Sequence, residues 1–167
     1  MFVTSVEGTG KLSSWADAGG KTGIAAGDAI CQARATGAGL ANAAKFKAWL
    51  GKTAAPAATP IARLTWNGPW ARVDGVLVAQ DKKDLGDESI ATGLNVDEHG
   101  HYLPAAQQPG AWTGDGVVPA LETCVDWTSA LLADKAKVGH HLDASDAWSA
   151  WASLSCDRSF HLYCFED

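Results

Sequence analysis

The stretch Cys156-Asp-Arg-Ser-Phe160-His-Leu-Tyr-Cys164-Phe-Glu166 decides the fold. If it is extended, large side chains occupy both of its faces, because successive side chains of a strand point to opposite sides. One face then carries Phe160, Leu162 and Cys164, and the other carries His161, Tyr163 and Phe165. Since both faces are largely apolar, we predict a central strand that a cysteine holds near its end.

The rest of the chain is predicted to form short elements separated by turns rich in glycine and proline. Residues 2–5 predict a strand, and its pairing with the C-terminal strand would close the domain. Helices are predicted over residues 24–35 and 42–50, strands over 61–65, 71–73, 76–79 and 124–129, and weaker strands over 90–96 and 102–103. Asp74-Gly75 is a hairpin signal, and residues 52–60 and 81–88 are predicted to be surface loops.

Length and charge exclude several classes of protein. With 167 residues, the chain is predicted to form a single domain over residues 1–167, of the α+β class and with its own core. The net charge of -6, without a run of Lys or Arg, argues against binding nucleic acid or anionic lipid. No apolar run approaches the roughly 20 residues that cross a bilayer, so we expect no membrane insertion.

Four cysteines allow two disulfides in three possible pairings, and the residues alone do not choose among them. We favour the nested pairing of Cys31 with Cys164 and of Cys124 with Cys156. Loop closure makes the outer bridge worth about 5 kcal/mol and the inner one about 4 kcal/mol of stability. Because disulfides persist in oxidising compartments, we expect a secreted or cell-surface protein.

Short motifs in a characteristic order carry a resemblance to a known superfamily. They are Cys31 in a helical segment, Ala38-Gly39-Leu40, Phe46-Lys-Ala-Trp49-Leu50, Trp112-Thr-Gly114, Thr123-Cys124-Val-Asp-Trp127, Ser155-Cys156 and Leu162-Tyr-Cys164-Phe-Glu166. In this order the chain resembles the C-type-lectin-like superfamily, and more closely the endostatin domains of collagens and bacterial extracellular domains of unknown function. The resemblance spans nearly the whole chain. It implies a twisted, mostly antiparallel sheet with two short helices and long loops, and the nested disulfide pairing.

The chain departs from the binding sites known in that superfamily. The calcium-dependent sugar site has a Glu-Pro-Asn or Gln-Pro-Asp tripeptide and a Trp-Asn-Asp motif, and the sequence has neither. Endostatins bind heparin through an arginine-rich face and zinc through N-terminal histidines, whereas this chain is acidic and its first histidine is His99. We therefore expect none of these sites and no cofactor, with calcium as a lesser alternative.

Candidate metal ligands are few. His99 and His101 lie two residues apart beside acidic residues, and Asp143 and Asp146 offer oxygen ligands for calcium. A metal site needs three or four converging ligands, so we predict none and keep these four residues as weak candidates. The chain has no serine-hydrolase or zinc-protease motif, and its cysteines are assigned to disulfides. We predict no catalytic residue and no enzyme, with a metal-dependent hydrolase as a remote alternative.

Tryptophan is unusually frequent, with eight residues against two tyrosines. Indole rings fill cores or act as flat platforms for sugars and aromatic ligands. In Trp66-Asn-Gly-Pro-Trp70 two indoles bracket a turn, and loops on a rigid scaffold commonly carry recognition. The predicted ligand-binding residues are Trp66, Asn67 and Trp70. Trp148 and Trp151 are a second candidate pair, but they lie near the disulfides in the sequence, and we assign them with Trp127 to the core.

These observations predict a non-enzymatic recognition module that binds a glycan or an extracellular protein through its loops. The fold alone does not identify the ligand, because one fold hosts many functions. The main alternative is a structural domain of a larger surface protein without a specific ligand. In that case both Trp66 and Trp70 would be buried.

Overall fold

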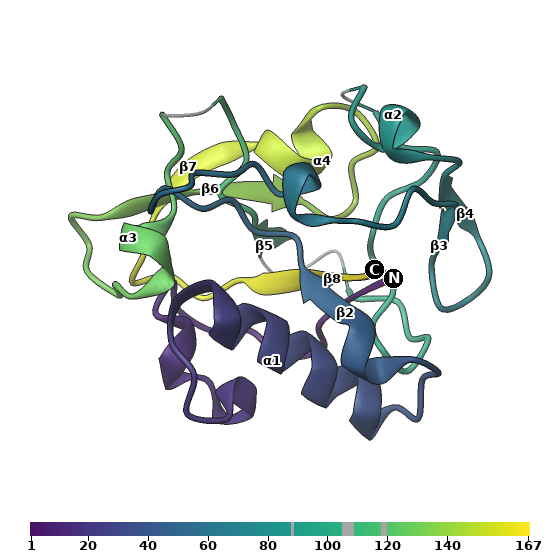
Figure 1. The fold of residues 1–167 in the computed structure, drawn as a ribbon, viewed down its shortest axis with the longest axis horizontal. Coiled ribbons are helices and arrows are strands. Elements are labelled where there is room, and N and C mark those ends of the chain that lie inside the picture. Colours follow the sequence, from purple (N-terminus) through teal and green to yellow (C-terminus); the bar gives the residue numbers. More distant parts are fainter. Residues whose placement is uncertain (88, 105–108, 118–119) are drawn as a thin grey trace.

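Strand β8 (His161–Glu166) lies in the middle of a mixed sheet (Figure 1). The computed structural model describes residues 1–87, 89–104, 109–117 and 120–167. The strand order is β1-β8-β5-β6-β7, and β2 also pairs with β8. The bounds are β1 (Phe2–Val3), β2 (Phe46–Ala48), β5 (Gly110–Trp112), β6 (Lys135–His140) and β7 (Ala152–Ser155). β1 and β2 run antiparallel to β8 and β5 runs parallel to it, so the predicted pairing of the first and last strands is confirmed.

A separate hairpin and several short helical turns surround this sheet. The hairpin joins β3 (Trp70–Ala71) to β4 (Leu77–Ala79) through the predicted Asp74-Gly75 turn, where Gly75 has a φ of +86°. Short helices are α2 (Lys82–Leu85), α3 (Cys124–Trp127) and α4 (Ala147–Ala150), and 3-10 turns are η1 (Leu12–Ser14), η2 (Ala16–Ala18), η3 (Ala43–Lys45) and η4 (Ile61–Arg63). The termini lie side by side next to the hairpin (Figure 1).

The helix predicted over residues 24–35 is confirmed as α1 (Gly23–Gly37), which packs against β2 and β8. Its buried face includes Ile30 and Cys31. A Cβ atom on Gly27 would lie 2.6 Å from Leu50 Cδ1, so this glycine permits the close approach of helix and strand. Gly39, with a φ of +70°, follows the end of the helix.

The two faces of β8 enter two different hydrophobic clusters, as the alternation predicted. Phe160, Leu162 and Cys164 pack with α1 and with Trp112. Tyr163 and Phe165 pack on the other side, in a cluster that contains tryptophan rings from three parts of the chain: Trp49, Trp70 and Trp148. β8 is therefore buried on both faces, and residues far apart in the sequence meet on it.

Both disulfides have the nested pairing. Cys31 of α1 bonds to Cys164 of β8, and Cys124 bonds to Cys156. The outer bridge ties the first helix to the central strand. The inner bridge ties α3 to the chain that leads into that strand. An α+β fold with a mixed sheet, short helices and two disulfides is thus established.

The helix predicted over residues 42–50 is wrong. η3 makes a single turn, and β2 follows, with Phe46 and Ala48 buried and Lys47 between them partly exposed. β2 pairs with β8 over its whole length. The hydrogen bonds and buried area of this pairing outweigh the local helix preference of the alanine-rich segment.

Several other local predictions also differ from the structure. Residues 61–65 begin with the turn η4, which follows Pro60, and not with a strand. In residues 90–96 and 102–103 the structure has bridges such as Val96 with Tyr102, but no extended strand. The predicted loop 81–88 contains α2, because the Asp81 side chain accepts hydrogen bonds from the backbone of Lys83 and Asp84.

The strand predicted over residues 124–129 is also wrong. The element α3 lies there instead, and its single turn is left-handed. Residues 124–127 all have φ between 50° and 66°, and Val125 has φ 55° and ψ 56°. Left-handed backbone is unfavourable for residues other than glycine. Three interactions hold this turn in place. Two are buried: the inner disulfide and the Trp127 Nε1 hydrogen bond of 2.8 Å to Gly51 O. The third is made by the partly exposed Asp126 carboxylate, which accepts from the backbone nitrogens of Thr53 and Ala54.

Candidate functional site

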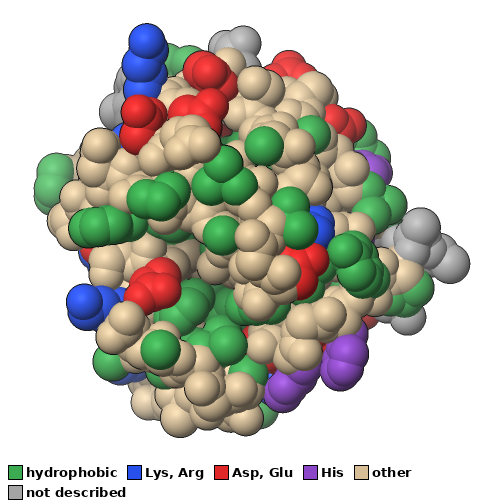
Figure 2. Space-filling view, turned by 90° about the vertical axis from the view of Figure 1, so that its right-hand side faces the viewer, with side chains coloured by type: hydrophobic (Ala, Val, Ile, Leu, Met, Phe, Trp, Pro, Cys, Tyr) green, Lys and Arg blue, Asp and Glu red, His purple; other side chains and the backbone are tan. Residues whose placement is uncertain are grey.

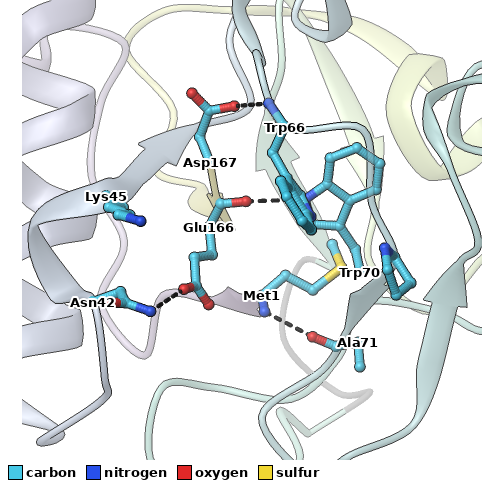
Figure 3. Close-up of a pocket in the computed structure, with 9 residues that line it drawn as sticks. Met1, Asn42, Lys45, Trp66, Trp70, Ala71, Glu166 and Asp167 are labelled. Carbon is cyan, nitrogen blue, oxygen red and sulfur yellow. Dashed lines mark hydrogen bonds between the residues drawn. The ribbon is translucent and has the colours of Figure 1, made fainter.

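A hollow of about 450 Å³ lies where β8 ends, beside the β3–β4 hairpin and the η3 turn (Figure 3). We call it the Trp66 pocket. Its lining residues are Met1, Asn42, Lys45, Trp66, Pro69, Trp70, Ala71, Glu166 and Asp167. Figure 2 shows the side of the molecule that is on the right in Figure 1, where Lys, Arg, Asp and Glu side chains are interspersed with hydrophobic ones.

The two indoles of the predicted recognition turn have different environments. The Trp66 residue is 53% exposed, whereas Trp70 is 2% exposed. Trp70 Nε1 donates to the carbonyl of Glu166 at 3.0 Å, and the Trp70 ring makes an edge contact with Phe165. Trp70 thus forms a fixed wall and Trp66 offers the accessible ring. Asn67 is exposed, and its backbone carbonyl accepts from Lys82.

The end of β8 anchors the segment that carries Trp66. The Asp167 carboxylate accepts hydrogen bonds from the backbone nitrogens of Thr65 and Trp66, the latter at 2.8 Å, and pairs with Lys47 at 2.5 Å. Burial opposes the charge of Asp167, but the hydrogen bonds from Lys47, Trp66 and Thr65 outweigh it and lower its pKa to about 2. The carboxylate therefore stays ionised at neutral pH and holds the loop in place.

Polar side chains complete the pocket opposite Trp66. Asn42 Nδ2 donates to Glu166 Oε1 at 2.7 Å, which leaves the second carboxylate oxygen without a hydrogen-bond partner among the described residues. Lys45 is exposed and lines the same hollow. The pocket therefore combines an aromatic face, a carboxylate and an ammonium group.

Sequence reasoning missed Asn42, Lys45 and Glu166 as pocket residues. The first two were assigned to a helix that does not form. Glu166 is the last residue of β8 and its one residue that is not fully buried, and a charged residue that ends an apolar strand was the one signal that could have indicated it.

The first pair of weak metal candidates lies on a surface loop. The rings of His99 and His101 have their centroids 6.1 Å apart. His101 Nδ1 lies 3.6 Å from Asp97, whose other oxygen accepts from the backbone nitrogens of both histidines. His99 lies 3.9 Å from Glu98, but that carboxylate is already paired with Arg34. The neighbouring acids therefore have structural partners.

Asp143 and Asp146 do not complete a metal site either. Asp143 accepts from the Ser145 side chain and backbone, which lowers its pKa. Asp146 precedes α4 and lines a different hollow. In the parts of the chain that the structure describes, no three His, Cys, Asp or Glu side chains converge in a way that could hold a metal ion.

A second group of histidines is buried. The ring of His141 lies with its centroid 5.9 Å from that of His161, and neither of its nitrogens has a partner among the described residues. Burial, followed by the proximity of His161 and His140, lowers the pKa of His141 to about 4. His141 is thus neutral at neutral pH, as a core residue must be when no counter-charge is present.

Among the tryptophans assigned to the core, Trp127 and Trp148 are buried. Trp151 is 47% exposed, so its assignment was wrong. Its ring stands edge-on to His140 with centroids 5.2 Å apart. Trp66 and Trp151 are therefore two well-exposed indoles in different settings, one at a pocket and one outside it.

A scan against protein-family models finds no match, and a search of curated proteins finds no similar sequence. No helix within the described residues is long and apolar enough to span a bilayer. The argument for function consequently depends on the fold and on the geometry of the pocket.

Proposed function

We propose that the chain is a secreted or cell-surface recognition module that binds a glycan in the Trp66 pocket and catalyses no reaction. The observation that carries this proposal is the exposed Trp66 ring beside Lys45 and Glu166. A sugar has an apolar C–H face that packs on an indole and hydroxyl groups that bond to charged side chains at its rim. The pocket offers both kinds of contact within one small hollow.

The size of the pocket favours a glycan over a protein partner. A hollow of about 450 Å³ is in the range of sites that enclose small molecules. A stable protein interface covers about 800 Å² on each partner, which is much more than this pocket offers. Its walls are also fixed by hydrogen bonds of Asp167 and Trp70, so little ordering is needed when a ligand binds.

We infer a C-type-lectin-like, endostatin-like fold from the way in which the first and last segments of the chain are joined. The pairing of β1 with β8 and the nested bridges, of which Cys31–Cys164 is the outer one, support this assignment. β2 is a departure from the expected second helix. The two disulfides also support an oxidising compartment, since such bridges are rare in reducing ones.

A glycan array probed with the oxidised protein tests the proposed function. Trp66→Ala is expected to reduce binding by about tenfold or more, which corresponds to roughly 1.4 kcal/mol of lost contact energy. Trp151→Ala is the matched control, because it removes an indole of similar exposure outside the pocket. Undiminished binding by Trp66→Ala would contradict the proposal, and an array without any bound glycan would favour the structural-domain alternative.

A further inference from the structure

A second hollow, of about 370 Å³, lies beside α4 and η4. We call it the Asp115 cleft. Trp49 and Trp148 belong to its lining but are buried, because their rings pack on each other with centroids 5.0 Å apart and planes tilted by 41°. Aliphatic side chains such as Ile61 line the sides. The lining of the cleft is thus mainly apolar.

A chain of hydrogen bonds fixes a carboxylate in this cleft. Trp49 Nε1 donates to Ser149 Oγ at 2.7 Å, and Ser149 Oγ donates to Asp115 Oδ2 at 2.5 Å. The other Asp115 oxygen accepts from the backbone nitrogen of Gly116 at 2.8 Å. The position of the carboxylate is therefore coupled through Ser149 to the Trp49 indole.

The charge of the cleft is unbalanced. Its lining has two carboxylates, Asp115 and Asp146, and no Lys, Arg or His among the described residues. Elsewhere, the buried Glu98 and the partly buried Asp167 form salt bridges with Arg34 and Lys47. Asp115 forms none within the part of the chain that is described.

The electrostatics of Asp115 reflect this missing partner. Burial raises the pKa of Asp115, and the hydrogen bonds from Ser149 and Gly116 offset only part of that effect. Asp115 is partly buried, and a carboxylate that is partly removed from water without a counter-charge loses solvation that nothing replaces. A positively charged ligand in the cleft would supply the counter-charge and reduce this cost.

We propose that the Asp115 cleft binds an alkylammonium group, its alkyl substituents lying against the apolar lining and its charge facing the Asp115 carboxylate. Methylated ammonium groups are weakly hydrated, so they enter apolar sites more readily than a primary ammonium does. Charge complementarity selects a cation over a neutral molecule of the same shape. This site is separate from the Trp66 pocket and does not depend on glycan binding there.

The test uses choline as the probe and 3,3-dimethylbutan-1-ol as its uncharged isostere. The eight tryptophans give separate indole N–H signals in a ¹H–¹⁵N spectrum, which Trp→Phe variants assign. Choline is expected to shift the Trp49 and Trp148 signals saturably, and the isostere is expected to bind at least tenfold more weakly. Equal affinity for the two probes, or shifts confined to Trp66 and Trp151, would overturn the proposal.

Asp115→Asn tests the role of the carboxylate, since it keeps the shape of the side chain and an acceptor for Ser149. We expect choline affinity to fall at least tenfold. Asp157→Asn is the matched control on an exposed acid that is not part of the cleft, and should leave affinity unchanged. The same spectra report whether each variant is folded. Wild-type affinity in folded Asp115→Asn would refute the site.

Discussion

We expect the Val125→Gly protein to have a higher free energy of unfolding than a protein with the same substitution at an ordinary surface valine. Val125 lies in the left-handed turn with φ 55° and ψ 56°, and it is 61% exposed. Its backbone conformation, and not its burial, therefore dominates its contribution to stability. A left-handed conformation costs a residue with a Cβ atom about 1–2 kcal/mol, whereas glycine adopts it without this penalty.

Val76→Gly is the matched control. Val76 is 41% exposed and does not have a positive φ. Both substitutions give the unfolded chain the same additional freedom, worth about 0.4–1 kcal/mol, so that this effect cancels in the comparison. The small difference in exposed fraction contributes a few tenths of a kcal/mol. The free energy of unfolding of Val125→Gly should exceed that of Val76→Gly by about 1–2 kcal/mol.

Urea unfolding followed by tryptophan fluorescence measures this difference, with both disulfides kept oxidised. In thermal unfolding it corresponds to roughly 2–8 °C in the midpoint temperature for a chain of this size. Val125→Ala keeps a Cβ atom and should show little of the gain. If Val125→Gly is no more stable than Val76→Gly, the left-handed turn at Cys124–Trp127 is refuted.

Three further predictions concern the disulfides, the stability of the protein at low pH and the packing of α1. Removing the outer bridge with Cys31→Ser and Cys164→Ser should lower the unfolding free energy by about 5 kcal/mol, and removing the inner bridge should lower it by about 4 kcal/mol. The outer bridge contributes more because it spans 133 residues and the inner one spans 32. A larger loss for the inner bridge in chemical denaturation would contradict this. Asp167 has its pKa lowered to about 2, so its stabilisation is fully present above about pH 4 and is lost as the pH falls through 2. Asp167→Asn should therefore remove part of the pH dependence of denaturation between pH 4 and 2, and identical curves for the two proteins would disprove the role of this carboxylate. Gly27→Ala should lower the free energy of unfolding by about 1–3 kcal/mol, since its Cβ would lie 2.6 Å from Leu50. Gly37→Ala in the same helix meets no atom within 4 Å and should raise the free energy of unfolding by up to about 1 kcal/mol. Similar effects of the two substitutions in urea unfolding would argue against the close packing at Gly27.

The sequence predicts the centre of the fold because the signals there are strong and local. The apolar alternation around Leu162 and Tyr163 has the period of a strand and places each side chain in its observed cluster. The helix with Cys31 and the Asp74-Gly75 turn likewise follow from nearby residues. The disulfide pairing, by contrast, followed from resemblance and not from the residues alone.

The elements that were predicted wrongly depend on contacts between distant parts of the chain. Residues 42–50 have local helix preference, but β2 gains a long partner in β8. The turn at Val125 is held by a disulfide and by side-chain bonds to residues 51–54, none of which is visible in a local pattern. Local sequence therefore identifies the segments but not the partners that determine their shape.

The candidate site shows the same division. Trp66 was predicted to bind a ligand because two indoles bracket a turn, and the structure shows that its ring is exposed. Trp70 was chosen on the same ground but is buried: it packs against Phe165, and its Nε1 atom donates to the carbonyl of Glu166, 96 residues further along the chain. The pairing of Glu166 with Asn42 could not be read from the sequence for the same reason.

One aromatic layer supports both proposed sites. Trp49 of the Asp115 cleft stacks on Phe165 with centroids 4.9 Å apart, and Phe165 meets the edge of Trp70 from the Trp66 pocket at 6.3 Å. Phe165 belongs to β8, which the outer disulfide and three neighbouring strands hold in place. Because packed rings resist displacement, the two hollows keep their shape without a ligand. The irregular loops can therefore present fixed walls, although regular secondary structure makes up little of either site.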